Sequence, residues 1–154
     1  MRHEEVNQEL RSVVFDYFYW FSRFEFALKE NGYLKKGPRS IAQADWVKFI
    51  DLHRNDYYPG NQAKELLEDP PKTQTVNGRG VEWHDLVFDE GQSELSKVVL
   101  IIKTIRNNLF HGGKHGVDDW DNPDRVRFLL SRGIVVLNEF SILSRLEADY
   151  LRYY

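Results

Sequence analysis

Three long stretches of this chain place apolar residues at steps of three and four, a spacing that gathers them on one face of an α-helix. They cover residues 6–28, a segment from about 94 to 111, and residues 123–152. Because each helix must bury its apolar face, the pattern predicts an all-α fold, an up-and-down helical bundle of four to five helices. The predicted inner faces consist of Val6, Leu10, Val13, Tyr17, Phe21, Phe24 and Leu28, of Leu95, Val98, Val99, Ile102, Ile105 and Leu109, and of Val126, Leu129, Leu130, Leu137, Phe140 and Leu146.

Turn and capping residues predict where the helices begin and end. Asn31-Gly32 supplies the left-handed residue that ends the first long helix. Ser40 is suited to cap a helix over residues 41–56, and Ser93 to cap the central helix. Asn122-Pro123 opens a last helix that we expect to run to about residue 152.

The connections are predicted to be irregular. Residues 35–38 form a short basic loop, and a short helix over 62–68 stops at Pro70-Pro71. From about residue 70 to 92 no long periodic run occurs, and Asn77-Gly78 indicates a loop. With 154 residues, the chain is expected to be a single domain over residues 1–154 with an irregular loop at about 70–92.

Composition excludes several classes of function. The chain has no cysteine, which rules out disulfides and thiolate chemistry. It has no apolar run near the roughly 18 residues of a membrane span, and its first residues lack a secretory apolar segment. We therefore expect a cytoplasmic protein with no membrane partner. The net charge of −3 argues against a protein that coats nucleic acid, so any basic surface must be local.

The first helix carries more aromatic surface than one buried face requires. Val14, Phe15, Phe18 and Phe26 lie outside its inner stripe. Either this helix is buried on two sides or one side meets another subunit. The second reading predicts a two-fold homodimer.

The central helix ends in TIRNNLFHGG, residues 104–113, where polar residues crowd a segment expected to be buried. Two interpretations compete, a self-capped helix end and a catalytic cluster. Asn107 and His111 are four residues apart and share a face, whereas Arg106 and His111 lie about 140° apart on a regular helix. Arg106 and His111 converge only if the last turn frays, and Gly112-Gly113 provides that break.

Such a cluster supports cleavage of a phosphodiester. A histidine that titrates near neutrality serves as general acid or base, so this role falls to His111. The guanidinium of Arg106 suits a phosphate and the charge that develops during its cleavage. Asn107 orients the imidazole or binds a phosphate oxygen. No metal is required, because RNA supplies its own nucleophile in the 2′-hydroxyl and leaves a 2′,3′-cyclic phosphate.

Arg106-Asn107-Asn108-Leu109-Phe110-His111 resembles the motif of the HEPN superfamily: Arg, a polar residue, a few more positions, then His. Helix order, chain length and the position of the motif extend the resemblance over most of the chain. The resemblance implies a compact helical bundle, a dimer with two motifs facing one cleft, and metal-independent RNA cleavage in toxin–antitoxin, antiviral defence or RNA-processing systems. It makes Arg106 and His111 catalytic and Asn107 supporting. Some HEPN domains instead bind or regulate, and this remains the alternative.

Further residues are candidates for lesser roles. Lys103, Asn108, Lys114 and His115 are candidate substrate-binding residues, placed to contact RNA beside the motif. Glu25 either pairs with Lys29 on the helix surface or faces Arg106 or His111 as an accessory residue.

No metal or cofactor is expected. His111 and His115 have a zinc-like spacing, but glycines break the helix between them and no third ligand is near in sequence. We therefore expect a homodimeric endoribonuclease that acts on RNA. The alternative is a non-catalytic module that binds a nucleotide, RNA or a partner protein such as a nucleotidyltransferase antitoxin.

Overall fold

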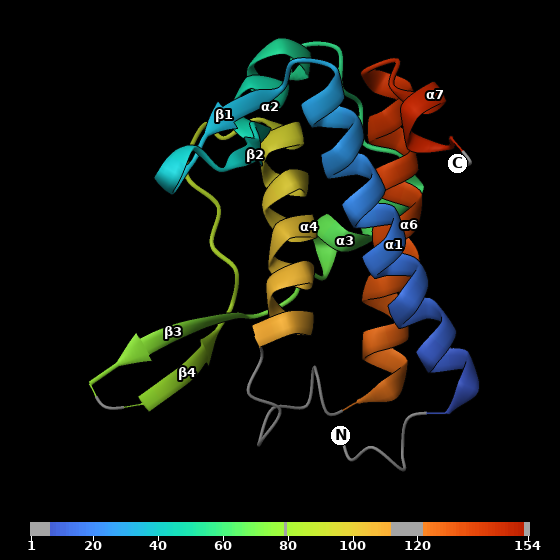
Figure 1. Ribbon diagram of the computed structural model, residues 1–154. Coiled ribbons are helices and arrows are strands. Elements are labelled where there is room, and N and C mark those ends of the chain that lie inside the picture. The colour runs from blue at the N-terminus through green and yellow to red at the C-terminus, as the bar shows by residue number, and fades with distance from the viewer. Residues whose placement is uncertain (1–6, 79, 112–121, 153–154) are drawn as a thin grey trace.

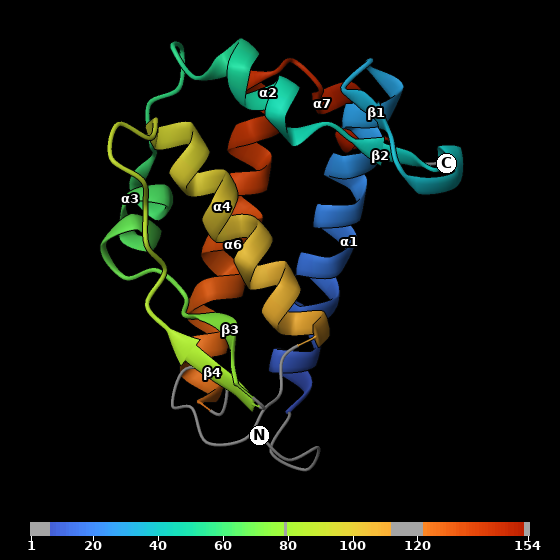
Figure 2. The same cartoon turned by 90° about the vertical axis from the view of Figure 1, so that its left-hand side faces the viewer.

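The computed structural model describes residues 7–78, 80–111 and 122–152, without the side chains of Asn77 and His111. The chain is mostly helical, and its three long helices are α1 (Gln8–Glu30), α4 (Glu94–His111) and α6 (Pro123–Leu143). Helix α6 packs against both α1 and α4 (Figures 1 and 2). Three shorter helices, α2 (Trp46–His53), α3 (Asn61–Glu68) and α7 (Glu147–Tyr150), pack on the long ones.

The core lies between the long helices, as their apolar spacing predicts. Val6 lies outside the described residues, and Val13 and Leu109 are half-buried, but every other residue of the predicted inner faces is buried. Tyr17 is fully buried on α1, and its hydroxyl donates to the carbonyl oxygen of Ile102 on α4 at 2.7 Å. Burying each large apolar side chain stabilises the fold by about 1.5–3 kcal/mol.

Three of the predicted helix boundaries are confirmed. Helix α1 ends at Glu30, and Gly32 follows with a φ of 78°. The Ser93 hydroxyl accepts from the backbone N–H of Ser96 at 3.2 Å and caps α4. Asn122 caps α6 through its side-chain oxygen, with proline at the first helical position.

The predicted helix over residues 41–56 is wrong in its first part. Strands β1 (Leu34–Lys36) and β2 (Ala42–Ala44) pair antiparallel, with a short 3₁₀ turn, η2 (Pro38–Ser40), between them. The hydrogen bonds of this hairpin hold residues 42–44 extended, so Ser40 cannot cap a helix. Asp45 caps α2 instead, since its side chain accepts from the N–H of Lys48 at 3.1 Å.

The irregular loop predicted at about 70–92 contains a second hairpin. Strands β3 (Thr73–Asn77) and β4 (Gly80–His84) pair in register from Thr73 opposite His84 to Asn77 opposite Gly80. Gly78, with a φ of 58°, makes the turn. The hairpin projects away from the helices (Figure 1), which explains why its pattern lacks a buried face.

The last helix stops earlier than predicted. Helix α6 ends at Leu143, and Arg145, with a φ of 57°, breaks the helical path before α7 begins at Glu147. Arg23 of α1 fixes this corner, because its Nε donates to the carbonyl of Tyr150 at 3.2 Å. None of the described helices is long and apolar enough to cross a membrane.

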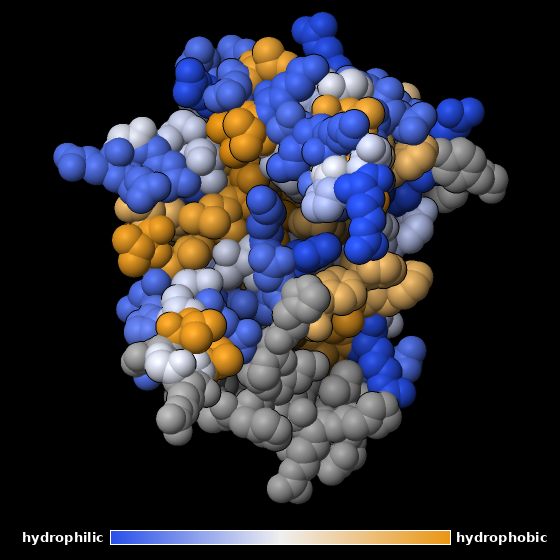
Figure 3. Space-filling view, turned by 60° about the vertical axis from the view of Figure 1, so that its left-hand side comes forward, coloured by the Kyte–Doolittle hydropathy of each residue, from blue (hydrophilic) through white to orange (hydrophobic). Residues whose placement is uncertain are grey.

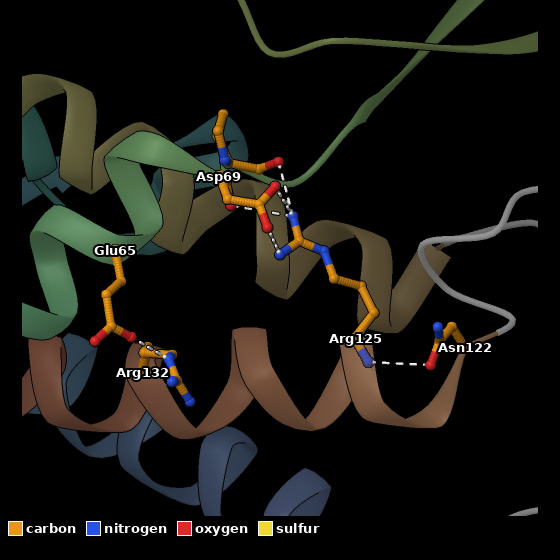
Figure 4. Close-up of polar contacts among 6 residues, drawn as sticks. Glu65, Asp69, Asn122, Arg125 and Arg132 are labelled. Atoms are coloured by element: carbon orange, nitrogen blue, oxygen red, sulfur yellow. Dashed lines mark hydrogen bonds and ion pairs between the residues drawn. The ribbon is translucent and has the colours of Figure 1, made fainter.

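Ion pairs tie α3 to α6 (Figure 4). Arg125 donates through both terminal nitrogens to the carboxylate of Asp69, at 2.6 and 2.9 Å, and also reaches the carbonyl of Pro70. Arg132 pairs with Glu65 at 2.7 Å. These contacts fix the end of α3, which is joined to β3 by residues 69–72.

Candidate functional site

Arg106 lies in the penultimate turn of α4, half-buried between aromatic rings. Its guanidinium carbon is 5.7 Å from the ring centres of both Phe21 on α1 and Phe110 on α4. Its Nη1 donates to the side-chain oxygen of Asn107 at 3.0 Å. The guanidinium is therefore held in place by its own surroundings, with no bound partner required.

A pocket of about 300 Å³ opens beside Arg106, between α1, the β1–β2 hairpin and α4. We call it the basic pocket. Figure 3 turns this side of the molecule forward and shows hydrophilic residues down the middle of the face with hydrophobic residues on either side. The basic pocket is lined by Phe21, Glu25, Lys29, Lys35, Ala42, Gln43, Ala44, Trp46, Lys103, Arg106 and Asn107.

The charge of this pocket is opposite to that of the whole chain. Among the described residues that line the pocket are four cations, Lys29, Lys35, Lys103 and Arg106, and one carboxylate, that of Glu25. The sequence as a whole has a net charge of −3. A local group of cations in a recess raises the local concentration of anions, and arginine and lysine bind both phosphates and carboxylates.

The crowding of positive charge affects the pKa of Lys103. Desolvation in the pocket lowers the pKa of Lys103, and the neighbouring Lys35 and Arg106 lower it further. Glu25 opposes the shift. An anion in the pocket would replace lost hydration and offset the repulsion, which favours binding of a phosphate.

Glu25 is held at the pocket wall by α2. Its Oε1 accepts from the indole Nε1 of Trp46 at 2.9 Å. Of the two readings of Glu25, the ion pair with Lys29 is not formed among the described residues, whereas Glu25 and Arg106 do line one pocket. Glu25 therefore moderates the positive charge of the pocket.

Asn108 lies on the other side of α4 and is buried. Its Nδ2 donates to the carbonyl of Lys72, just before β3, at 2.7 Å. A second pocket, of about 280 Å³, opens there between α4 and the start of β3. We call it the amide pocket. It is lined by Thr73, Gln74, Thr104, Asn107 and Asn108.

Exposed aromatic residues border Arg106 on the third side. Phe18 and Phe110 pack with their ring centres 5.5 Å apart, although 47% and 50% of their surfaces remain exposed. Phe15 is 63% exposed, and its ring is stacked on that of Tyr19 with the ring centres 6.3 Å apart. Of the residues outside the inner stripe of α1, Phe15 and Phe18 are therefore exposed within this chain, and Phe18 adjoins Arg106, whereas Val14 and Phe26 are half-buried.

The structure brings together Arg106, Asn107, Lys103 and Glu25 among the residues predicted from the sequence. The backbone of His111 ends α4, but its side chain lies outside the described residues, as do Lys114 and His115. The convergence of Arg106 and His111 at Gly112-Gly113 also falls outside them and stays a prediction. Within the described residues no group of three or more His, Asp or Glu side chains is placed to hold a metal.

The sequence analysis does not identify Lys29 and Lys35 as site residues. Lys35 belongs to a visible basic segment, but only the β1–β2 hairpin places it near α4. Comparison of the chain with protein-family models, with curated proteins and with solved structures found no match. The chemistry of the site is therefore argued from its own residues.

Proposed function

We propose that this protein binds RNA at the basic pocket and cleaves it as a metal-independent endoribonuclease of the HEPN type. The observation that carries the proposal is the meeting of Arg106 with three lysine side chains in one pocket, in a chain with a net negative charge. Arg106 belongs to the Arg106–His111 motif, so the phosphate-binding charge and the motif occupy the same end of α4. This relationship favours a phosphodiester as the bound group.

Each residue has a chemical role in this proposal. The guanidinium of Arg106 binds the scissile phosphate and stabilises the charge that develops on it, and Lys103 and Lys35 hold neighbouring phosphates. His111 as general base removes the proton from the 2′-hydroxyl, whose oxygen bonds to phosphorus as the bond to the 5′-oxygen breaks. The leaving 5′-oxygen takes a proton from a general acid. The products are a 2′,3′-cyclic phosphate and a 5′-hydroxyl.

A homodimer supplies the second proton-transfer group. One histidine does not readily act as base and acid within one step, whereas two copies of His111 facing one cleft divide these roles. Phe18 borders the site, and together with the exposed Phe15 on the same helix it would supply apolar area for a two-fold interface. A toxin, an antiviral defence effector and an RNA-processing factor all fit this activity.

The second candidate is a binding module without turnover. The volume of the basic pocket, about 300 Å³, lies at the lower end for small-molecule sites, and Glu25 limits its positive charge. Both features suit one nucleotide rather than a long RNA. A partner protein, such as a nucleotidyltransferase antitoxin, would occupy the same face.

An RNA cleavage assay separates the two candidates. A mixed-sequence, end-labelled RNA is incubated with EDTA and wild type, Arg106→Ala or His111→Ala protein, all purified identically to control for contaminating nuclease. Arg54→Ala is the matched control, because Arg54 is an exposed arginine at the end of α2, outside the pocket lining. Cleavage by wild type and Arg54→Ala alone, leaving 2′,3′-cyclic phosphate ends, supports the endoribonuclease. Equal cleavage by all four proteins, or none, moves the binding module to first place.

A further inference from the structure

We propose that the amide pocket binds the edge of a nucleobase and makes RNA recognition base-selective, with Gln74 of β3 as a specificity-determining residue. This inference rests on the proposed function, since it requires an RNA phosphate in the basic pocket. It also gives the β3–β4 hairpin a role in recognition.

The chemistry of the amide pocket differs from that of the basic pocket. The described residues that line it are two threonines, two asparagines and a glutamine, and none of them is charged. Asparagine and glutamine carry both a donor and an acceptor, so they pair with the complementary groups on base edges. A phosphate would be drawn to the cations of the basic pocket instead. The composition of the amide pocket therefore fits a neutral ligand rich in donors and acceptors, as a base is.

Asn107 connects the two pockets, because it lines both. Its side-chain oxygen accepts from Nη1 of Arg106, which leaves its Nδ2 group to donate elsewhere. A phosphate bound by Arg106 therefore lies one side chain away from the amide pocket. A base attached to the adjoining ribose is positioned to enter it.

The wall formed by β3 is fixed relative to α4. Asn108 donates to the carbonyl of Lys72, the residue before Thr73, at 2.7 Å. Two and three residues before Lys72, Arg125 of α6 binds the carbonyl of Pro70 and the carboxylate of Asp69 (Figure 4). Strand β3 also contacts α4 directly, as Figure 2 shows. Gln74 is thus presented at the pocket by an anchored backbone, and such preorganisation favours selective recognition.

The expected selectivity is measurable. A well-placed pair of hydrogen bonds from an amide side chain to a base discriminates by about 5-fold to 150-fold in affinity. An aromatic stacking site would show much weaker preference, because every base has a stacking face. A preference that depends on Gln74 therefore identifies recognition by hydrogen bonds.

The test measures dissociation constants for decamers of A, of C, of U and of alternating G and U, all carrying 2′-fluoro groups that prevent cleavage. An abasic decamer reports binding of the backbone alone. The variant is Gln74→Met, which keeps the volume of the side chain and removes its hydrogen bonds. Thr73→Val is a second variant of nearly unchanged shape. Thr75→Ala is the matched control, because Thr75 lies on the same strand, is exposed and is not among the described lining residues of the amide pocket.

We expect wild type and Thr75→Ala to bind the preferred decamer at least 5-fold more tightly than the poorest. In Gln74→Met the four affinities should come within about 2-fold, with the abasic decamer unaffected. A preference that survives Gln74→Met would overturn the role of Gln74. Equal affinities in wild type, or a preference that survives both Gln74→Met and Thr73→Val, would overturn the amide pocket as well, while leaving phosphate binding in place. If wild type binds neither the abasic decamer nor any RNA, the proposed function fails as well.

Discussion

Arg106 donates a hydrogen bond from Nη1 to the side-chain oxygen of Asn107, its neighbour in α4, at 3.0 Å. Adjacent residues on a helix point in different directions, so this contact turns the guanidinium across the helix surface. Phe21 and Phe110 hold the group from either side. The donors of Arg106 are therefore largely oriented without a ligand, which would reduce the entropy lost if a phosphate binds there.

Replacing Arg106 by lysine should show that its shape matters as well as its charge. Lysine keeps one positive charge but loses the planar set of donors and the stacking on Phe21 and Phe110. We expect Arg106→Lys to weaken RNA binding by about 1–2 kcal/mol and to lower the cleavage rate at least 100-fold. Fluorescence anisotropy and single-turnover cleavage measure the two effects. Arg54→Lys is the control, and unchanged cleavage by Arg106→Lys would contradict the assigned role.

As pH rises, the affinity of the basic pocket for RNA should begin to decrease at a lower pH than the affinity of an ordinary lysine-rich surface does. Desolvation, Lys35 and Arg106 lower the pKa of Lys103, and only its protonated form attracts phosphate. As pH rises, Lys103 therefore loses its proton below the usual range for lysine, and affinity decreases there. The measurement is the dissociation constant of a 2′-fluoro RNA, which resists alkaline cleavage, across neutral to alkaline pH.

Lys103→Arg is the informative comparison for this pH dependence. Arginine stays protonated throughout, so the decrease in affinity should move to higher pH in the variant. Identical pH profiles for wild type and Lys103→Arg would show that Lys103 does not contribute to binding.

Glu25→Gln should strengthen binding of RNA. The glutamine oxygen can still accept from Nε1 of Trp46, so the wall of the pocket keeps its shape while the charge of Glu25 is removed. Because the pocket is open to water, removing one unit of negative charge about 4 Å from the phosphate is worth about 1 kcal/mol, or about 5-fold in affinity. Glu30→Gln, on the same helix but outside the pocket lining, is the control in an affinity measurement at low salt. A weaker complex with Glu25→Gln would mean that the carboxylate itself contacts the ligand.

The parts of this fold that depend on local sequence were predictable. Ser93 and Asn122 cap α4 and α6 through atoms two or three residues away, and the apolar spacing of the long helices identified the core. Ser40 and Asp45 are both good capping residues, and the choice between them is made by the pairing of β1 with β2. That pairing depends on backbone hydrogen bonds between segments, which periodicity does not report. Asn77-Gly78 is a hairpin signal, but the short strands beside it lack a buried face.

The candidate site was predictable only in part. Arg106 and Asn107 are identified by their motif, which is local in sequence. The approach of Lys35 to Lys103 requires the β1–β2 hairpin to lie against α4, and no local pattern encodes that contact. The amide pocket likewise depends on contacts between α4 and the segment that leads into β3, among them the hydrogen bond from Asn108 to Lys72. Sites assembled from separate elements are found from tertiary structure.

The exposed aromatic residues of α1 should mediate association of two copies of the chain. Phe15 is 63% exposed, and burying such a side chain stabilises an interface by about 1–2 kcal/mol per copy. We expect wild type to sediment as a dimer at micromolar concentration and Phe15→Ser to shift the equilibrium toward monomer. Leu52→Ser is the control, because Leu52 is 57% exposed but lies on α2. A wild-type monomer at all concentrations would remove the dimer from the proposed mechanism.

Gly133→Ala should destabilise the protein, although alanine is the better helix former by about 1 kcal/mol. A Cβ at position 133 of α6 would lie 2.5 Å from Cε2 of Tyr17. The Tyr17 ring is fully buried and fixed by its hydrogen bond to the carbonyl of Ile102, so it cannot move without losing that bond. We expect a net loss of about 1–3 kcal/mol in the free energy of unfolding, measured by urea denaturation.

The cause of this loss is tested by a double-mutant cycle. Tyr17→Leu removes the ring that the new methyl group would contact, so Gly133→Ala should lower the free energy of unfolding much less in the Tyr17→Leu background than in wild type.

The same strain should also affect RNA binding. Ile102 lies one turn before Arg106, so Gly133→Ala should loosen the end of α4 and weaken RNA binding. Additive effects on stability would show that Tyr17 does not transmit the strain, and unchanged RNA affinity would show that the packing of α1, α4 and α6 does not set the position of Arg106.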